Sequence, residues 1–592
     1  MKDKRTLPQR TQEEMQALMR VALGEAPADL AIRNADLVNV YTGEIQKNMG
    51  VAVKGPWIAR VSAEVGDTIG PATRVIDAAG RTLVPGLIDG HTHLAWSYTA
   101  AAFVPFAAAA GVTAVVTETL EPFPVAGVAG VLDFLDSFRG QPIRILATAP
   151  VMVSISSAAR GISSPDLERL LRRDDVLGLG ESYWQAVLQE PEPYLPAFLA
   201  THRLGKVLEG HSAGASEKKL AAYIAAGVTS CHEPIDASQV LARLRLGVHV
   251  MVREGSIRRD LEAISRIRED RVDLRRLVLA SDGASPLDLM QGKYMDFVIR
   301  KAVACGFTPV EAIQMATLNV AEHFRLDGVL GGIAPGRLAD MALVADVAEF
   351  KPETLVCNGA VVYESGRLVE EPRAHAFSAA SLNTIRLPRR LEPADFSIRP
   401  PSGGSAARVR VMEMVTDLVT AERCLDLPVT NGEIRANPAE NLCKIAAVDR
   451  THDPGKRFTG LITGFGLARG ALACSAAWDT SDIVVIGADE MDMACAVNRI
   501  AELQGGAVLC AAGRVLAEIA MPIFGLASDL PMAAVAAQMA DLKHAIARLG
   551  VGFPDPLLSL IALTGAAIPY LRICEEGLVN LKDGKTVGLF VS

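Results

Sequence analysis

The stretch VPGLIDGHTHL, residues 84–94, is the part of this sequence that predicts the fold most directly. An apolar run is interrupted by a Pro-Gly pair, resumes, and ends in two histidines, His91 and His93, that are one residue apart. Side chains at positions i and i+2 of a strand point to the same face of a sheet. The two imidazoles are therefore expected to hold one metal ion together, at the end of a buried strand.

Short apolar runs like this one alternate with helical stretches over the next part of the chain. Eight such runs, separated by helices, predict a (β/α)8 barrel, a TIM-like fold of the α/β class. An open doubly wound sheet is the alternative, because periodicity alone does not separate the two. The eight runs lie at residues 83–89, 112–118, 142–150, 176–181, 206–211, 228–233, 248–254 and 277–282.

Polar side chains stand where several of these runs end. In a barrel, the carboxyl ends of the strands meet at one rim, and the active site lies there. The residues are His91 and His93 after the first run, Glu181 after the fourth, His211 after the fifth, His232 after the sixth and Asp282 after the eighth.

Four imidazoles and two carboxylates at one rim predict a metal site. They are too many ligands for a single four-coordinate zinc ion with an open position. The set suits two divalent ions that share a bridging carboxylate and a hydroxide. Because the ligand atoms are nitrogen and oxygen, Mn²⁺, Fe²⁺ or Zn²⁺ fits the set better than a metal that prefers thiolate ligands.

The remaining sequence predicts further domains around the barrel, which we expect to span residues 85–330. Residues 29–84 and 331–375 both contain apolar runs of strand length separated by turn residues, which predicts one composite β domain. A Pro-, Gly- and Ser-rich stretch at about 376–405 is typical of a linker. The other expected parts are an N-terminal helical segment at 1–28 and a C-terminal α/β domain at 406–592.

Composition excludes several classes of protein. The chain has 592 residues, and its net charge of -9 does not indicate a nucleic-acid binder. The N-terminal residues are charged and lack the apolar core of a secretory signal, and no apolar run is long enough to span a membrane. Nine scattered cysteines without a Cys-x-x-Cys pair fit a reducing compartment, so we expect a cytoplasmic protein.

Several motifs resemble a known group of enzymes. PGLIDGHTHL, GLGE, EGHSAG, AAGVTSCHE and ASDGASPLDL are similar to the adenine deaminase family of the amidohydrolase superfamily, and the similarity covers most of the chain from about residue 30 onward. Many binuclear amidohydrolases bridge their metals with a carboxylated lysine on strand four. This chain has Glu181 there, as the adenine deaminases do.

The resemblance implies a reaction and roles for named residues. It implies hydrolytic deamination of adenine to hypoxanthine and ammonia, by a hydroxide held on a binuclear metal centre, as part of purine salvage. Asp282 would serve both as a metal ligand and as a proton shuttle. Glu233 is the first candidate for the acid that protonates a ring nitrogen, and Glu121 is the second. The expected partner is a small purine, and the expected assembly is a homodimer.

The sequence departs from the family pattern near the expected substrate position. Residues 118–121 are Glu-Thr-Leu-Glu where the family has Asp-Pro-His-Glu, and Cys231, Gly283 and Lys293 replace two aspartates and a histidine. These changes leave the six expected metal positions intact. They keep open an amidohydrolase that acts on a different amino-heterocycle or cyclic amide. A non-catalytic scaffold is a second alternative, but such a protein would be expected to lose metal ligands.

Overall fold

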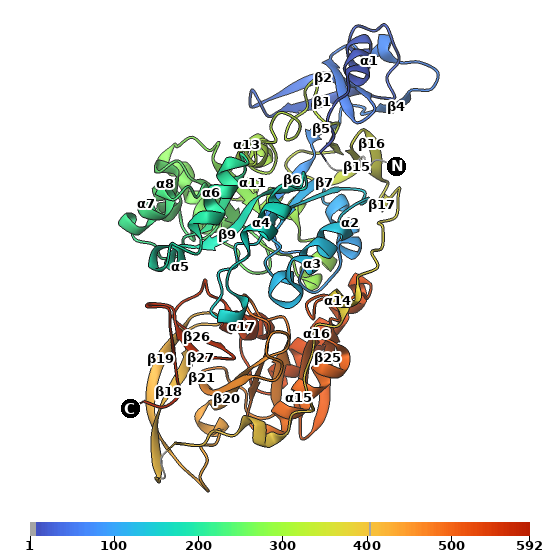
Figure 1. The fold of residues 1–592 in the computed structure, drawn as a ribbon. Coiled ribbons are helices and arrows are strands. Elements are labelled where there is room, and N and C mark those ends of the chain that lie inside the picture. Colours follow the sequence, from blue (N-terminus) through green and yellow to red (C-terminus); the bar gives the residue numbers. More distant parts are fainter. Residues whose placement is uncertain (1–6, 402–403, 592) are drawn as a thin grey trace.

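A computed structural model of the protein describes residues 7–401 and 404–591. Residues 1–6 of the expected N-terminal segment, 402–403 of the expected linker and 592 of the expected C-terminal domain lie outside the described residues. Figure 1 shows a β sheet at one end of the molecule, a barrel in the middle, and a second mixed α/β part at the other end.

Eight parallel strands form a barrel, which confirms the predicted fold class. Strands β6 to β10 pair in one arc and β11 to β13 in another. The backbone N–H of Thr229 donates to Leu208 across one gap between the arcs, and that of Asp282 donates to His91 across the other, both at 2.9 Å. The strands are β6 (Leu87–Thr92), β7 (Val112–Thr117), β8 (Arg144–Ala149), β9 (Val176–Tyr183), β10 (Val207–His211), β11 (Ser230–Cys231), β12 (His249–Arg253) and β13 (Leu277–Ala280).

Helices connect these strands and cover the outside of the barrel. Polar caps begin several of them: Ser163, Asp236 and Thr308 each accept a hydrogen bond from a backbone N–H in the first turn. The helices are α2 (Ala100–Ala109), α3 (Pro122–Ser137), α4 (Ser164–Leu171), α5 (Trp184–Gln189), α6 (Leu195–Arg203), α7 (Glu217–Ala225), α8 (Ala237–Arg245), α9 (Leu261–Ile264), α10 (Pro286–Met290), α11 (Met295–Ala304), α12 (Pro309–Met315) and α13 (Leu318–His323).

The stretch at 84–94 serves two sheets, because the chain changes direction at Gly86. Strand β5 (Thr82–Pro85) ends just before this glycine and pairs antiparallel with β14 (Met341–Val344), whereas β6 begins just after it and enters the barrel. A Cβ atom at position 86 would lie 2.3 Å from the side chain of Thr113. The glycine therefore lets the chain pass close to β7 at this point.

Strands from both sides of the barrel sequence build one sheet. Its order is β17-β16-β15-β14-β5-β1-β2-β3, with β4 paired to β1. Helix α1 (Gln12–Ala22) packs against β2 and β3, and the buried pair of Arg144 and Asp340, 2.7 Å apart, joins this sheet to the barrel. The strands are β1 (Leu30–Asn39), β2 (Glu44–Lys54), β3 (Trp57–Ser62), β4 (Arg74–Asp77), β15 (Pro352–Cys357), β16 (Ala360–Glu364) and β17 (Arg367–Leu368).

The C-terminal part is built on a mixed sheet in the order β19-β18-β21-β20-β23-β22-β24-β25. Helix α15 (Glu490–Leu503) packs on β22 and β24, and α16 (Met532–Arg548) packs on β25. The strands are β18 (Ala406–Met414), β19 (Thr420–Pro428), β20 (Leu442–Asp449), β21 (Arg457–Thr463), β22 (Ala471–Cys474), β23 (Asp482–Gly487), β24 (Gly506–Ala511) and β25 (Arg514–Ala520); helix α17 (Pro556–Ile561) and the hairpin strands β26 (Leu571–Cys574), β27 (Gly577–Asn580) and β28 (Lys585–Val587) follow.

The segment around 376–401 does more than connect two domains. It contains the short helix α14 (Ala379–Leu382), which packs against α3 of the barrel. Its side chains Ile385, Leu391 and Phe396 are buried in the apolar core of the C-terminal sheet. The sequence pattern did not predict this packing, because these apolar residues are spaced irregularly among prolines and arginines.

The C-terminal part lies over the carboxyl end of the barrel. The Ser154 hydroxyl, on the loop after β8, donates to the backbone oxygen of Asp479 at 2.5 Å, and the backbone N–H of Ser97 donates to Leu526 at 2.9 Å. Helix α10 of the barrel packs against α16.

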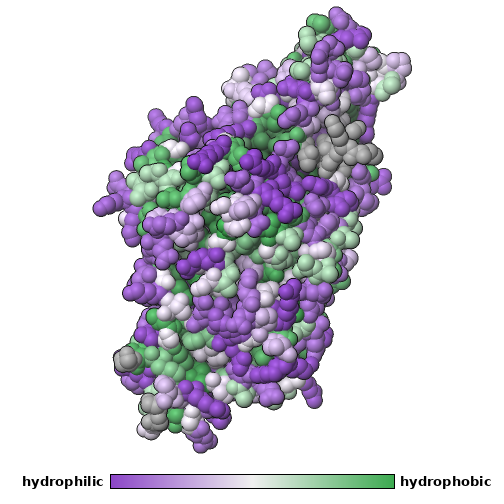
Figure 2. Space-filling model, viewed as in Figure 1, coloured by the Kyte–Doolittle hydropathy of each residue, from purple (hydrophilic) through white to green (hydrophobic). Residues whose placement is uncertain are grey.

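Within residues 7–401 and 404–591, every helix is too short or too polar to cross a membrane. Hydrophilic side chains cover most of the face shown in Figure 2.

Candidate active site

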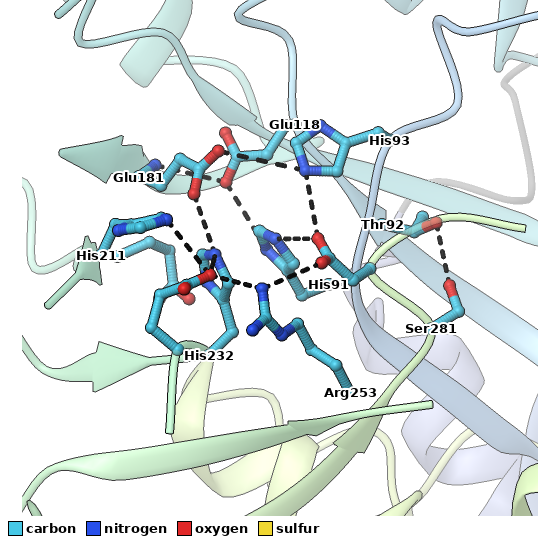
Figure 3. Close-up of polar contacts among 12 residues, drawn as sticks. His91, Thr92, His93, Glu118, Glu181, His211, His232, Arg253 and Ser281 are labelled. Carbon is cyan, nitrogen blue, oxygen red and sulfur yellow. Dashed lines mark hydrogen bonds and ion pairs between the residues drawn. The ribbon is translucent and has the colours of Figure 1, made fainter. Parts of the chain in front are cut away.

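One cluster of titratable side chains occupies the carboxyl end of the barrel, as Figure 3 shows for most of its members. The structure brings the six sequence-predicted metal ligands together there. Five of them are buried, and the sixth, His93, is partly exposed. His91 lies in β6 and His93 directly follows that strand; Glu181 lies in β9, His211 ends β10, His232 directly follows β11, and Asp282 follows β13.

Asp282 faces the first pair of histidines. Its Oδ1 atom lies 3.4 Å from Nε2 of His91 and 3.4 Å from Nε2 of His93. Burial disfavours the ionised carboxylate, but contacts with the two histidines outweigh it and hold the pKa of Asp282 well below its usual range. The backbone of Asp282 is left-handed, with φ of 59°. Such conformations are concentrated at active sites, where surrounding contacts hold them in place.

Glu181 lies between His93 on one side and His232 on the other. Its Oε1 is 4.0 Å from Nε2 of His93, and its Oε2 is 3.0 Å from Nε2 of His232. The pKa of Glu181 falls to about 2, because contacts with His232 and other histidines outweigh the effect of burial. The imidazole of His232 stacks on that of His91, with ring centroids 4.2 Å apart. The two oxygens of Glu181 therefore face different histidines, His93 and His232.

The two predicted proton donors occupy different environments. Oε1 of Glu233 lies 3.1 Å from Nε2 of His211 and 3.4 Å from Nε2 of His232, so Glu233 stands among the candidate ligands. Glu121 instead contacts Nδ1 of His93 from the outer side of that ring. A carboxylate in this position orients a metal-binding histidine.

Arg253, at the end of β12, connects three acidic side chains. Its guanidinium donates to Glu233, to Oδ2 of Asp282 at 3.3 Å and to Oδ2 of Asp260 at 3.2 Å. Burial opposes the charge of Arg253, but the carboxylates outweigh it and raise the pKa further. The sequence placed Arg253 at a strand end, yet an arginine does not bind metal, so ligand counting assigned it no role.

Asp89 holds the strands that carry the cluster. It is fully buried, and its carboxylate accepts hydrogen bonds from the backbone N–H of Ser281 at 3.0 Å, the Ser281 hydroxyl at 2.6 Å and the Tyr294 hydroxyl at 2.7 Å. Asp89 lies two residues before His91, and Ser281 directly precedes Asp282. These bonds therefore fix the ends of β6 and β13 against each other.

The donor set fits divalent metal ions. The ligand atoms of each of three groups lie within 4.8 Å of one another. Nε2 of His91 and Oε2 of Glu181 are buried and form no well-aligned hydrogen bond with any described residue. Lone pairs that face a common point without a hydrogen between them suit a cation. The groups are His91, His93 and Asp282; His91, Glu181 and His232; and His211, His232 and Glu233.

Comparison with known proteins assigns the chain to a family. Residues 82–362 match the Amidohydrolase family, and residues 417–585 match the Adenine deaminase C-terminal domain. A protein of Moorella thermoacetica named adenine deaminase is 36% identical over 586 residues, covering 98% of both chains. The chain belongs to the adenine deaminase family.

Other members of the adenine deaminase family are similarly close. The adenine deaminase of Rubrobacter xylanophilus is 35% identical and covers 96% of both chains. Adenine deaminase 3 of Rhizobium meliloti is 34% identical and covers 95% of this chain and 96% of its own. Among solved structures, a β-aspartyl dipeptidase from Fervidobacterium islandicum is 18% identical, with a TM-score of 0.46, and covers 58% of this chain and 97% of its own.

In this member of the adenine deaminase family, Glu118 is a site residue that the sequence reasoning missed. It follows β7, is 1% exposed, and its Oε1 lies 3.7 Å from Nδ1 of His91 and accepts a hydrogen bond from the backbone N–H of Glu181 at 3.3 Å. Burial raises the pKa of Glu118 to about 7. The rule that selects polar residues at strand ends applies to Glu118 as well, although only its neighbour Glu121 was predicted from the sequence.

Gly180 makes room for Glu118. A Cβ at position 180 would lie 2.2 Å from Oε2 of Glu118 and 3.1 Å from the backbone oxygen of Ala149. We expect Gly180→Ala to displace Glu118 and the neighbouring Glu181, and so to weaken divalent metal binding by about 10- to 100-fold. Calorimetric titration of the metal-free protein with Mn²⁺ measures this effect.

A matched substitution separates this effect from the general cost of replacing glycine. A Cβ atom added at Gly328 would have no neighbouring atom within 4 Å, so Gly328→Ala should leave Mn²⁺ affinity unchanged. Equal Mn²⁺ affinity in Gly180→Ala and Gly328→Ala would contradict the packing role of Gly180.

The cluster opens into a cavity of about 500 Å³. The barrel lines one side with all the candidate ligands except His91, and with Leu120, Ile257 and Arg258. The C-terminal part lines the other side with Thr416, Leu418, Val419, Trp478, Asp479, Ala567, Ile568 and Pro569. No sequence signal marked these C-terminal residues as part of the site, because they belong to loops of a different sheet.

Proposed function

We propose that this chain deaminates adenine hydrolytically, giving hypoxanthine and ammonia. The observation that carries the proposal is the buried cluster of four imidazoles and two carboxylates at the barrel rim, in a chain similar over almost its whole length to proteins named adenine deaminase. The reaction replaces the amino group at C6 of the purine with oxygen. It needs a water nucleophile, a group that moves its proton, and an acid for the ring.

We assign the cluster to two divalent ions, Mn²⁺ or Fe²⁺, with Zn²⁺ as the alternative. His91, His93 and Asp282 would hold one ion, and His211 and His232 the other. Glu181 would bridge them, since its two oxygens face His93 and His232 respectively. When bound, the ions would supply an activated water as the nucleophile.

Asp282 is our candidate for the group that moves the proton of the attacking water. Contacts from His91 and His93 hold one of its oxygens toward the cluster, and Arg253 holds the other at 3.3 Å. The carboxylate, which lines the cavity, is thereby fixed in one orientation. We assign to Asp282 the transfer of a proton from the water to the departing amino group.

The acid for the ring nitrogen is assigned to Glu233 first and to Glu121 second. Both side chains line the cavity. Glu233 is held by Arg253 and lies next to His211, whereas Glu121 is held against His93. Substitution of each by glutamine, with kcat for adenine as the readout, would tell them apart: the larger loss identifies the acid.

Turnover of adenine by the Mn²⁺-loaded protein is the direct test. The conversion to hypoxanthine is followed by the change in ultraviolet absorbance, and ammonia is measured in parallel. A panel of other aminopurines, pterins and cyclic ureides runs beside it. Absence of adenine turnover with Mn²⁺ and with Fe²⁺ would reject the proposal, and turnover of another panel member would point to the alternative amidohydrolase activity.

Two further expectations stay predictions. We expect a cytoplasmic enzyme of purine salvage, in keeping with nine cysteines that form no disulfide within the described residues. We also expect a homodimer, and light scattering coupled to size-exclusion chromatography measures its mass.

A further inference from the structure

One loop of the C-terminal part delivers two side chains to the cavity. It connects β22 to β23 and carries Trp478 and Asp479, both of which line the cavity that holds the cluster. Trp478 packs over Gly565, where an added Cβ would lie 3.3 Å from its ring. The loop is anchored to the barrel, because the Ser154 hydroxyl donates to the backbone oxygen of Asp479.

The carboxylate of Asp479 is rigidly held at the cavity wall. The residue is 3% exposed. The Tyr183 hydroxyl donates to Oδ1 at 3.0 Å, and the backbone N–H of Ala566 donates to Oδ2 at 2.8 Å. A carboxylate has about four acceptor positions, so two strong donors leave room for another. Neither donor is itself a candidate metal ligand, although the Tyr183 ring packs edge-on against His211, with ring centroids 5.2 Å apart.

Asp479 enters the cavity from the C-terminal part, and the candidate metal ligands enter it from the barrel. The amino group at C6 must reach the metal cluster, which forms the barrel side of the cavity. In adenine, N9 of the five-membered ring is bonded to C4, so the N9–H lies on the edge of the base away from the amino group, whereas N7 lies beside that group. A buried carboxylate with an open acceptor position is the complement of such a donor.

We propose that Asp479 accepts a hydrogen bond from the N–H of the five-membered ring, so that the C-terminal part selects the free base. The inference rests on the proposed adenine deamination and adds a specificity residue to it. A base that carries a substituent at this nitrogen would lose the hydrogen bond, and the substituent would clash with the side chain of Asp479. Discrimination against substituted bases then comes from the C-terminal part, while the reaction occurs on the barrel.

The test compares adenine with 9-methyladenine, which has no ring N–H. The kcat/KM of the Mn²⁺-loaded wild type and Asp479→Ala is measured with both bases, and 9-methyladenine is measured as a competitive inhibitor where its turnover is too slow. We expect Asp479→Ala to lower kcat/KM for adenine by about 10- to 100-fold, because the ring N–H is left without its acceptor in a buried cavity. The value for 9-methyladenine should change by less than about threefold, because the lost bond was never made.

Two further variants keep the result interpretable. Asp479→Asn preserves the shape of the side chain and should give a smaller loss in the same direction. Asp529 is exposed in the same part of the chain, so Asp529→Ala should leave both substrates within about twofold of wild type.

The outcomes separate this inference from the proposed function. Equal losses for adenine and 9-methyladenine, in an active enzyme, would mean that Asp479 is only structural and would overturn the inference. A wild type that does not turn over adenine would overturn the proposed function and the inference together.

Discussion

Asp282→Asn is expected to lower kcat for adenine by about 10³-fold while the barrel stays folded. The amide is almost the same size as the carboxylate and can still present an oxygen to His91 and His93, which lie 3.4 Å from Oδ1. It cannot accept and return a proton. The loss should therefore appear in kcat, with the circular dichroism spectrum and the thermal unfolding midpoint close to those of the wild type.

Metal content must be measured in the same samples, because Asp282 is also a candidate ligand. A variant that keeps its Mn²⁺ and loses kcat supports the proton-transfer role. The control is Asp288→Asn, in helix α10 after the same strand, where the carboxylate pairs with Arg259 at 3.0 Å outside the cluster. It should stay within about twofold of wild type. Near-normal turnover by Asp282→Asn would reject the assignment.

The barrel was predictable because its topology brings residues that are distant in sequence to one rim. His91, His211 and Asp282 are far apart along the chain, yet each follows a short apolar run, and parallel strands of a barrel end on the same side. Knowing only which strand a polar residue follows was enough to group them. Glu118 follows the second apolar run and obeys the same rule, so its place at the rim was also predictable from the sequence.

Other features depend on contacts that no local pattern reports. The role of Gly86 is to bring the chain past Thr113, and the run at 83–89 gave no sign that it would split between two sheets. Asp479 lies in a loop between strands of the C-terminal sheet, and its place in the cavity depends on how two domains pack. Periodicity describes one element at a time, so it cannot predict which loop of one domain covers the active site of another.

The second large effect is expected at Arg253, which pairs with two buried acids, Asp282 and Asp260, and with the partly buried Glu233. Arg253→Met removes the guanidinium that contacts Glu233, Asp282 and Asp260, and leaves their negative charges close together without a partner. Breaking a buried ion pair from one side costs about 3 to 5 kcal/mol. We expect the free energy of unfolding to fall by about this amount, and kcat for adenine to fall with it as Asp282 and Glu233 lose their fixed orientation.

Arg253→Lys tests whether charge or shape matters. Lysine keeps the positive charge, but it is a point charge and lacks the planar fork that reaches three carboxylates at once, so it should recover only part of the stability. The matched control is Arg259→Met on the following loop, where an ion pair with Asp288 is half exposed and should contribute at most about 1 kcal/mol. Urea unfolding of the metal-free proteins gives the comparison. If Arg253→Met were as stable as Arg259→Met, the three acids would have to be protonated or solvated, and the fixed orientation of Asp282 would lose its physical basis.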